Sequence, residues 1–380
     1  MNKRSILAIL IFFLFVGISL PATAQEPVVQ AKAAVLMDIE TGQVLWERNG
    51  STLLPPASTT KVLTSILAYE MGDVEKNCFI SQKAAAVGEA SLHLRAGETL
   101  TLGELLNGAL ICSGNDACVA IAENIAGTEA FFVHWMNNKC QILGATNSSF
   151  INTNGLPAEN HLVSAYDLAM ISRYALYNQE FSSVVRKRSE IIGQGTSKRY
   201  LTNTNKLLWN YPECIGVKTG TTNAAGPCLV SAAEKKGRKC LAVVLNSPDR
   251  YGDSYRLLEY GLNNFTPATI FKEGELVGFV NVNNGVSTHV EAEISSDESI
   301  ILPTSNAGSF RKVYRLKNEI LAPIKAGQSL GHIAVYDGEN RLISTVNVTA
   351  RNNIPEKLKW WEQLFKWSFL IRKKGIYQYS

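Results

Sequence analysis

Residues 55–67 read PPASTTKVLTSIL and combine a turn, a reactive pair of side chains and the start of a helix. A helical pattern of apolar residues follows the two prolines, at Val62, Leu63, Ile66 and Leu67. This pattern predicts a helix with Ser58 at or beside its N-terminus. Ser58 and Lys61 then lie on one face of the first turn, within reach of each other. We expect the Lys61 amine to accept the Ser58 proton, because the helix dipole and apolar neighbours favour that transfer.

Two further short motifs can carry chemistry, although each is common when taken alone. Ser113-Gly114-Asn115 interrupts a helical pattern between Leu100 and Ile125 and leaves two short polar side chains at the break. Lys218-Thr219-Gly220 follows an apolar strand and offers a cation, a hydroxyl and a glycine that permits close approach. Ser-x-x-Lys itself occurs by chance on the order of once in a chain of this length. Each motif alone also fits a simple turn or strand end.

The segments around these motifs predict a mixed α and β domain. A hairpin is expected from Ala33 to Trp46, and three later strands suit one antiparallel sheet. The expected strands are Ile215 to Lys218, Cys228 to Ala232 and Leu241 to Leu245, and the flanking helices are Ala165 to Leu176 and Ser254 to Leu262. Because strands come from both ends of this region, we predict a helical cluster packed on a sheet.

A second, smaller domain is predicted to follow. From about Thr266 to Ala350 the sequence changes to short apolar runs separated by turn residues, which is typical of β hairpins. A chain of 380 residues also exceeds the usual length of one domain. We therefore expect a catalytic domain at 25–265 and a β domain at 266–353.

Both ends of the chain differ from its body. Residues 1–24 contain two basic residues, an apolar run and Ala22-Thr23-Ala24, which indicates an export signal cleaved near Ala24. Its apolar run is shorter than the roughly 20 residues of a bilayer span. Residues 354–380 predict a helix with an apolar face containing three tryptophans and a basic opposite face. Such a helix favours attachment to a membrane surface over docking against the β domain. We expect an extracytoplasmic protein on the outer face of the cytoplasmic membrane.

Composition argues against several other classes of protein. The net charge is +4, but the positive surplus lies at the two ends, so the mildly acidic body offers no broad basic face for nucleic acid. The seven cysteines include no Cys-x-x-Cys pair, and the five histidines form no His-Glu-x-x-His motif. Structural zinc, thioredoxin-like redox chemistry and zincin proteolysis are therefore unsupported. Most of the cysteines are best interpreted as small buried apolar residues.

The three motifs occur together, with Ser113 55 residues after Ser58 and Lys218 105 residues after Ser113. This combination is similar to the signature of active-site serine penicillin-recognising enzymes. More segments agree in order, namely Asn152-Thr153-Asn154-Gly155-Leu156, Ser164 to Ala169, Val217 to Thr222, and Arg250 ahead of Leu257 to Gly261. The chain resembles the low-molecular-mass penicillin-binding proteins that are serine-type D-alanyl-D-alanine carboxypeptidases, peptidase family S11. The resemblance also covers the β domain and the amphipathic tail.

This resemblance implies a fold and a reaction. The fold is an α/β (α+β) penicillin-recognising transpeptidase and β-lactamase-like domain, with a helical cluster on an antiparallel sheet, followed by a small all-β domain. The reaction removes the terminal D-Ala from peptidoglycan stem pentapeptides through an acyl-enzyme on Ser58, in cell wall biogenesis and control of cell shape. β-Lactam antibiotics would acylate the same serine. No metal or organic cofactor is implied.

The resemblance also implies residue roles. Lys61 would be the base for attack, Ser113 would relay the proton to the leaving amine, and Asn115 would hold the substrate amide. Lys218 would tune Ser113 and attract the terminal carboxylate of the substrate. The backbone N–H groups of Ser58 and Thr221 would form the oxyanion hole. The substrate-binding residues implied are Lys218, Thr219, Gly220, Thr221 and Arg250.

Two departures and two alternatives accompany this interpretation. Many relatives carry an arginine where this chain has Asn203-Thr204-Asn205, so carboxylate recognition is expected to depend more on Arg250. Cys112 directly precedes Ser113, and we hypothesise that modification of its thiol disturbs the proton relay. A class A-like β-lactamase would use Glu159 to activate water, although Val163 does not fit that pattern. A non-catalytic penicillin or peptidoglycan sensor would keep the pocket for recognition only.

Overall fold

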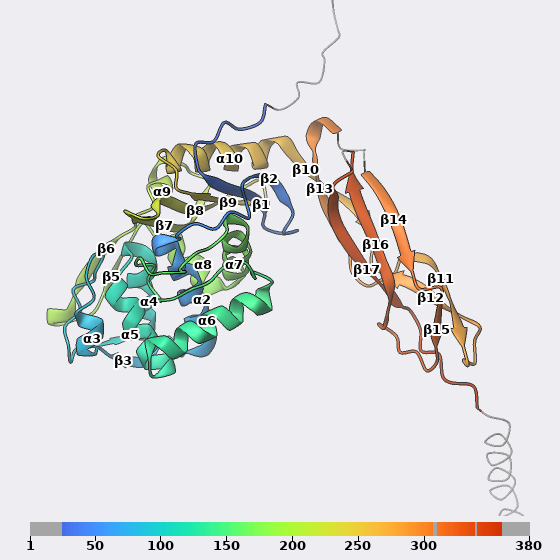
Figure 1. Cartoon of the computed structure of the whole chain (residues 1–380), viewed down its shortest axis with the longest axis horizontal. Helices are drawn as coiled ribbons and strands as arrows, with labels where there is room; N and C mark the ends of the chain where they lie inside the picture. Colours follow the sequence, from blue (N-terminus) through green and yellow to red (C-terminus); the bar gives the residue numbers. More distant parts are fainter. Residues whose placement is uncertain (1–24, 307–309, 339, 359–380) are drawn as a thin grey trace, which may run out of the picture. The chain divides into compact units, whose positions relative to one another are not determined.

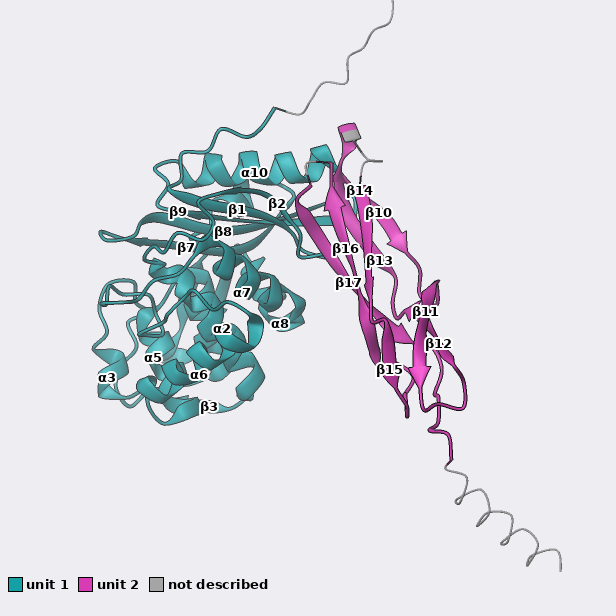
Figure 2. Cartoon of the chain, turned by 45° about the vertical axis from the view of Figure 1, so that its right-hand side comes forward, with its two compact units in different colours: residues 1–265 teal, residues 266–380 magenta. Residues whose placement is uncertain are grey.

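The computed structural model describes residues 25–306, 310–338 and 340–358. The chain divides after Phe265 into two compact units, unit 1 and unit 2, coloured separately in Figure 2. The predicted export signal and most of the predicted tail helix lie outside the described residues. Within the described ranges, no helix combines the length and the apolar character that crossing a bilayer requires.

Unit 1 is built on a five-stranded antiparallel sheet with the order β2-β1-β9-β8-β7 (Figure 1). Its strands are β1 (Ala33–Asp38), β2 (Val44–Arg48), β7 (Cys214–Thr222), β8 (Gly226–Lys235) and β9 (Arg238–Leu245). Ala33 of β1 pairs with Leu245 of β9, so strands from the two ends of the unit are neighbours. The predicted sheet is therefore confirmed.

Both faces of this sheet are covered by helices. Val35 and Met37 of β1 join the core beneath the main helical cluster, whereas Ala34 and Leu36 pack with α10 (Arg250–Asn264) on the other face (Figure 1). Successive side chains of a strand point to opposite faces, so a strand covered on both sides is apolar throughout. This explains why every residue of β1 is buried.

The main helical cluster carries the segments between β2 and β7. Its helices are α2 (Lys61–Met71), α3 (Gln82–Ala85), α4 (Leu102–Asn107), α5 (Asn115–Ala126), α6 (Glu129–Leu143), α7 (Ala165–Tyr177), α8 (Gln179–Val185) and α9 (Leu207–Asn210). Two small antiparallel ribbons accompany them, β3 (Asn77–Phe79) with β4 (Thr99–Thr101), and β5 (Ser189–Ile192) with β6 (Arg199–Thr202). A short 3-10 turn, η3 (Gly195–Ser197), lies between β5 and β6.

Two interruptions in the helical cluster matter for the site. The 3-10 turn η1 (Ala57–Thr60) precedes α2, so Ser58 lies beside the helix rather than within it. Between α4 and α5 the chain forms a π-helical turn, η2 (Gly108–Cys112), which ends at Ser113 in a left-handed conformation with φ 72°. The predicted break at Ser113-Gly114-Asn115 is thus present. A left-handed serine is uncommon, and such backbones are often found at functional sites.

Unit 2 consists of β strands and one short 3-10 turn in its described part. A two-stranded sheet pairs β10 (Phe265–Phe271) with β13 (Glu298–Pro303), and a six-stranded sheet has the order β14-β16-β17-β12-β11-β15. The latter strands are β11 (Leu276–Asn283), β12 (His289–Ile294), β14 (Phe310–Leu316), β15 (Glu319–Leu321), β16 (Ser329–Asp337) and β17 (Leu342–Ala350), and the turn is η4 (Thr304–Asn306). Alternating buried residues such as Val290, Ala292 and Ile294 form its core, as expected for an all-β domain.

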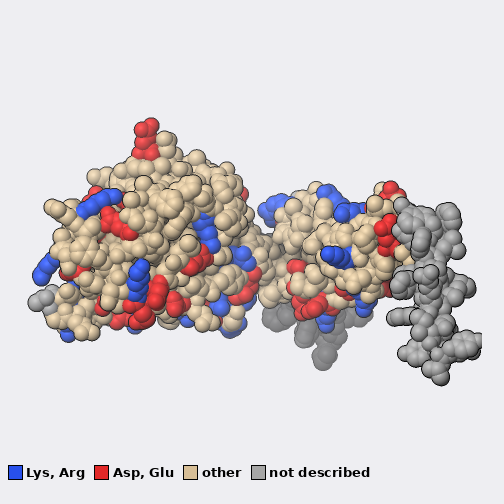
Figure 3. All heavy atoms as spheres, turned by 90° about the horizontal axis from the view of Figure 1, so that it is seen from below, with Lys and Arg blue, Asp and Glu red and all other residues tan. Residues whose placement is uncertain are grey.

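The chain stays extended beyond β17. Ile354 bridges Ile324, and Glu356 bridges Gly285, so pairing within unit 2 reaches into the range predicted for the tail helix. Ile354 also belongs to the apolar core of unit 2, which explains why this residue is held there. Residues 359–380 lie outside the described residues. On the face shown in Figure 3, acidic and basic side chains are interspersed among uncharged ones.

Candidate active site

Three elements of unit 1 bring the predicted site residues together. Ser58 lies on η1, Ser113 and Asn115 lie at the turn between η2 and α5, and Lys218 lies on β7. β7 is an edge strand of the sheet, and η1 packs against it near Gly220. A Cβ atom added to Gly220 would lie 2.9 Å from the Ser58 nitrogen and 3.0 Å from the Pro56 oxygen. Only glycine therefore lets β7 approach the Ser58 backbone so closely.

Lys61 is the centre of this arrangement. Its Nζ lies 2.9 Å from Ser58 Oγ, 2.8 Å from Asn115 Oδ1 and 2.6 Å from the backbone oxygen of Asn154. The side chain is fully buried, with 0% exposure. Burial disfavours the ammonium form and lowers the pKa of Lys61 to about 8. With this pKa roughly a tenth of the amine is neutral at pH 7, and this neutral form can accept the Ser58 proton.

The amide of Asn115 is oriented by the backbone around it. Asn115 Nδ2 donates to Gly88 O at 3.0 Å, and the Asn115 backbone N–H donates to Ala90 O at 2.8 Å. Because the amide nitrogen is used in this way, Oδ1 is the atom that faces Lys61. The segment that contains Gly88 and Ala90 therefore determines which end of the amide the lysine meets.

Lys218 is the second buried lysine of the site. Its side chain is 1% exposed, and Nζ donates to the Thr219 backbone oxygen at 3.1 Å. Burial, and then the positive charge of Lys61, lower the pKa of Lys218 to about 7. The two amines oppose each other's protonation, so they titrate as a coupled pair. Near neutral pH the pair can hold one proton and leave one free base.

Ser113 lies between Lys61 and Lys218 in the sequence, and its side chain makes fewer hydrogen bonds than theirs in the described part of the chain. It is buried at the end of η2, and the preceding Ile111 oxygen accepts from the Thr204 backbone N–H at 3.2 Å. Among the described residues, no hydrogen bond joins the Ser113 side chain to Ser58 or Lys218. The structure thus brings Ser58, Lys61 and Asn115 into direct contact and places Ser113 on the adjoining turn.

The far end of β7 carries the predicted substrate-binding residues. Arg250 Nη1 donates to Gly220 O at 2.9 Å and to Thr221 Oγ1 at 2.7 Å. The Thr219 and Thr204 hydroxyl oxygens lie 2.6 Å apart. Thr204 occupies the segment in which an arginine was expected from the resemblance, and the sequence analysis assigned it no role. Its contact with Thr219 places Thr204 beside β7, next to the predicted substrate-binding residues.

The sequence analysis also missed the loop that supplies Asn154. The Thr153 oxygen accepts from Thr64 Oγ1 at 2.6 Å, and a Glu129 carboxylate oxygen accepts from the Thr153 N–H and hydroxyl. These contacts fix the loop so that the Asn154 carbonyl faces Lys61. The segment was recognised as part of the resemblance, but a role played by a backbone oxygen leaves no signal in residue type.

His161 contacts η1, the turn that carries Ser58, and the sequence analysis likewise assigned it no role. Its Nε2 lies 3.1 Å from Thr60 Oγ1, which itself donates to Ala57 O at 2.9 Å. The imidazole therefore carries its proton on Nε2, since the threonine hydrogen is already used. Nδ1 has no partner among the described residues. Burial lowers the pKa of His161 to about 4 from its ordinary 6.5.

We expect His161 to make the folded protein sensitive to acid. Between pH 6.5 and about 4 the unfolded chain binds a proton that folded His161 does not, so stability falls as pH falls through this window. At pH 5 the loss due to His161 amounts to about 2 kcal/mol. Urea unfolding at pH 7.5 and pH 5 measures it, with His161→Gln as the comparison. The glutamine variant should lose less stability between these two values, and equal losses in both proteins would contradict this origin.

The cysteines and other titratable groups add little to the site. All seven cysteines, which lie within the described residues, are free thiols, and five of them are buried. Cys112 Sγ donates to Gly108 O at 3.3 Å, and burial raises the pKa of its thiol, which lowers its reactivity. The effect of Cys112 modification on the proton relay stays a prediction. Glu159 is exposed, unlike a water-activating base held in a site. No cluster of three metal-ligating side chains occurs in the described part of the chain.

Comparison with known proteins gives the same picture as the geometry. Residues 21–249 match the model of the D-alanyl-D-alanine carboxypeptidase family, Peptidase S11, and residues 265–356 match that of the penicillin-binding protein 5 C-terminal domain. The chain is 35% identical over 321 residues to the D-alanyl-D-alanine carboxypeptidase DacF of Bacillus subtilis, covering 82% of each chain. It is 30% identical to DacD of Escherichia coli over 364 residues, or 90% of this chain and 93% of that one.

Solved structures agree with these relatives. Penicillin-binding protein 5 from Haemophilus influenzae superposes with a TM-score of 0.76 at 26% identity, covering 88% of this chain and all of the other. Penicillin-binding protein 6B from Escherichia coli superposes with a TM-score of 0.67 at 28% identity, covering 86% and 97%. Because the family match spans more than half of the chain, the chain belongs to the peptidase S11 family and is a serine-type, penicillin-binding D-alanyl-D-alanine carboxypeptidase.

Proposed function

We propose that Ser58 is the nucleophile of this carboxypeptidase and that Lys61 is its base. The observation that carries the proposal is the 2.9 Å contact between Nζ of the fully buried Lys61 and Oγ of the half-buried Ser58. The Ser58 oxygen attacks the penultimate carbonyl of the substrate as its proton passes to Lys61. The C–N bond then breaks, D-alanine leaves with a proton on its amine, and water hydrolyses the resulting ester.

Ser113, Asn115 and Lys218 complete the proton path in this proposal. Ser113, on the turn that adjoins Asn115, passes a proton to the leaving amine. Asn115 orients Lys61 through Oδ1 and holds the substrate amide. Lys218, whose pKa is lowered to about 7 by burial and by the positive charge of Lys61, tunes Ser113 and attracts the terminal carboxylate of the substrate.

We also propose that the edge of β7 binds the substrate backbone and its terminal carboxylate. Gly220 allows the strand to lie against Ser58, so that the backbone N–H groups of Ser58 and Thr221 can share the developing oxyanion. The Thr219 and Thr221 hydroxyls and the positive charges of Lys218 and Arg250 face the carboxylate end. Arg250 donates hydrogen bonds to Gly220 O and Thr221 Oγ1, so it orients the edge of β7 and also gives that edge a positive charge.

The substrate in this proposal is a peptidoglycan stem peptide that ends in D-Ala-D-Ala, and β-lactams acylate the same serine. The relatives' names and the family match support this choice. We further propose a catalytic domain at 25–265, a β domain at 266–353 and a membrane-attaching helix at 354–380, acting on the outer face of the cytoplasmic membrane after cleavage near Ala24. The division into two units and the two family matches support the domain boundaries.

A single preparation of the protein in mild detergent tests this function. Incubation with benzylpenicillin should add the mass of the intact drug, and fragmentation of tryptic peptide 49–61 should place it on Ser58. The same preparation should release D-alanine from a pentapeptide ending in D-Ala-D-Ala. An adduct on another residue would contradict the proposed nucleophile. Drug uptake on Ser58 without any D-alanine release would instead favour a penicillin sensor.

A further inference from the structure

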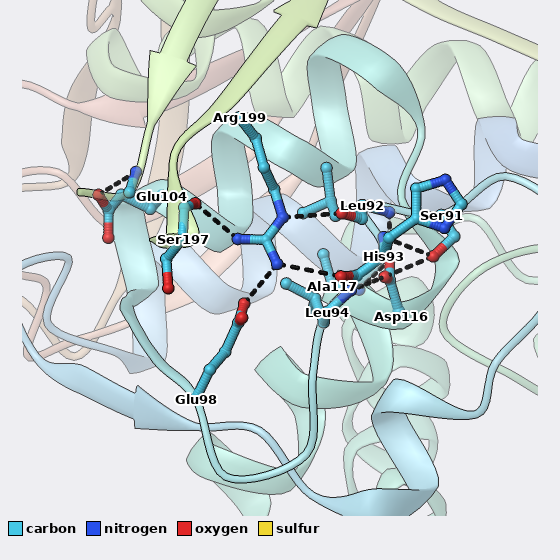
Figure 4. Close-up of polar contacts among 11 residues, drawn as sticks. Ser91, Leu92, His93, Leu94, Glu98, Glu104, Asp116, Ala117, Ser197 and Arg199 are labelled. Atoms are coloured by element: carbon cyan, nitrogen blue, oxygen red, sulfur yellow. Dashed lines mark hydrogen bonds and ion pairs between the residues drawn. The ribbon is translucent and has the colours of Figure 1, made fainter. Parts of the chain in front are cut away.

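Arg199 of β6 makes hydrogen bonds with a segment of chain that includes Leu92, His93 and Glu98 (Figure 4). Its Nε donates to Leu92 O at 2.7 Å, and its Nη2 donates to His93 O at 3.0 Å and to Glu98 Oε1 at 2.7 Å. The remaining arm, Nη1, donates to Ser197 O at 2.7 Å. The Arg199 side chain is 14% exposed and that of Glu98 10%, so this ion pair is largely shielded from water. All three nitrogens of the guanidinium are therefore engaged in one geometry.

The same segment is held from its other side by the first turn of α5. The buried carboxylate of Asp116 accepts from the Leu92 N–H at 3.0 Å, from the Leu94 N–H at 3.1 Å and from Ser91 Oγ at 2.6 Å (Figure 4). Leu92 thus has its N–H bound by Asp116 and its carbonyl bound by Arg199. A residue fixed at both backbone groups cannot shift without breaking one of two charge-assisted hydrogen bonds.

Leu92 in turn packs on both sides of the Ser113 turn. A Cβ atom added to Gly108 would lie 2.2 Å from Leu92 Cδ1, and one added to Gly114 would lie 2.8 Å from Leu92 Cγ. The leucine side chain therefore fills the space that the two glycines leave open. Any displacement of Leu92 would open a void against the backbone that carries Ser113 and Asn115.

Residues 88–94, in which Leu92 is bound by both Arg199 and Asp116, also orient the Asn115 amide. Gly88 O and Ala90 O accept from Asn115 Nδ2 and from its backbone N–H, a few residues before Leu92. These bonds present Oδ1 to Lys61 Nζ at 2.8 Å. A continuous set of contacts therefore leads from Arg199, through residues 88–94, to the amine of Lys61.

We propose that Arg199 is a positioning residue for acyl transfer, which holds residues 88–94 against the turn that carries Ser113 and Asn115. This inference rests on the proposed roles of Asn115 and Lys61. Arg199 does not touch substrate in this proposal, and its effect reaches the chemistry only through the placement of other groups. A displacement of about 1 Å in a reacting group can cost on the order of 100-fold in rate.

The test measures the pseudo-first-order rate constant for acylation by a fluorescent penicillin that is in large excess over the protein. This rate constant, unlike the amplitude, does not depend on the fraction of folded protein, so a loss of stability cannot mimic the effect. Arg199→Ala is expected to lower it by about 10- to 100-fold. Arg199→Lys should also be impaired, because one amine cannot reproduce three separately aimed groups. Arg186→Ala, which breaks an exposed ion pair with Glu234, is the matched control and should stay within about twofold.

The pH dependence of acylation separates positioning from a merely structural role. Asn115 Oδ1 accepts a hydrogen bond from Lys61 and so favours its ammonium form. Loss of this contact should lower the pKa of Lys61, and the increase of the acylation rate with pH should then occur at lower pH. Asn115→Ala should cause this shift, Arg199→Ala should cause part of it, and the double variant should shift no further than Asn115→Ala alone. The inference would be overturned if both Arg199 variants kept the native acylation rate and the native pH dependence while Asn115→Ala was impaired. An unimpaired Asn115→Ala variant would instead overturn the proposed role of Asn115.

Discussion

Replacing Lys61 with methionine is expected to lower the second-order rate constant for β-lactam acylation by about 10³-fold or more. Lys61 Nζ contacts Ser58 Oγ at 2.9 Å, and among the described residues no other amine contacts that hydroxyl. Methionine has a similar length but cannot accept the serine proton. Because the lysine is fully buried, removal of its charge also removes a desolvation cost, which offsets the loss of its hydrogen bonds. We therefore expect the variant to fold.

The control for Lys61→Met is a lysine of the same unit outside the site. Lys235 pairs with Glu259 at the opposite end of β8 from the active-site turn, so Lys235→Met should acylate at the native rate. Ser58→Ala sets the zero level of the assay. Circular dichroism and urea unfolding report whether each variant is folded. Acylation of a folded Lys61→Met protein within tenfold of the native rate would exclude Lys61 as the principal base.

Replacing Gly155 with alanine is expected to reduce acylation by at least about 100-fold and to destabilise unit 1 by a few kcal/mol. The added Cβ would lie 1.8 Å from Ala57 O and 2.9 Å from the Ser58 nitrogen. Both atoms belong to the backbone of η1, so no side-chain rotation can relieve the clash. Either the turn or the loop that presents Asn154 O to Lys61 has to move.

Gly127→Ala separates the clash at Gly155 from the strain of its backbone conformation. Gly155 has φ +90° and Gly127 has φ +78°, so alanine is strained at both positions. A Cβ on Gly127 would meet nothing within 4 Å, however. We expect Gly127→Ala to cost about 1 kcal/mol in urea unfolding and to keep the native acylation rate. Equal effects of the two substitutions would show that backbone strain, rather than contact with Ser58, is responsible.

Much of the fold could be predicted because its signals are local. The hairpin pattern that begins at Ala33 and the apolar runs at β8 and β9 indicated a sheet drawn from both ends of unit 1, and the structure confirms it. The break after η2 was likewise visible, because glycine and short polar residues interrupt a helical pattern at Ser113. Element boundaries were less certain, since the 3-10 turn at Ser58 has no distinct residue pattern.

The candidate site was only partly predictable. Ser58, Lys61 and Lys218 were predicted from the three motifs together with the family resemblance, and the structure brings Ser58 and Lys61 into contact. Asn154 and Gly155 act through a backbone oxygen and through the absence of a side chain, respectively, and neither role can be read from spacing. Arg199 escaped notice because its contacts join β6 to a segment about 100 residues earlier in the chain.

The sequence by itself determined the chemical groups of this protein, their order, and the period-two and helical patterns that specify its strands and helices. Only the tertiary structure decided that both site lysines are buried, which lowers the pKa of Lys61 to about 8 and that of Lys218 to about 7. It also decided that Asn154 O and Asn115 Oδ1 both face Lys61. The physical reason is that desolvation and hydrogen-bond geometry arise from atoms far apart in the chain, whereas residue type and periodicity are properties of each local segment.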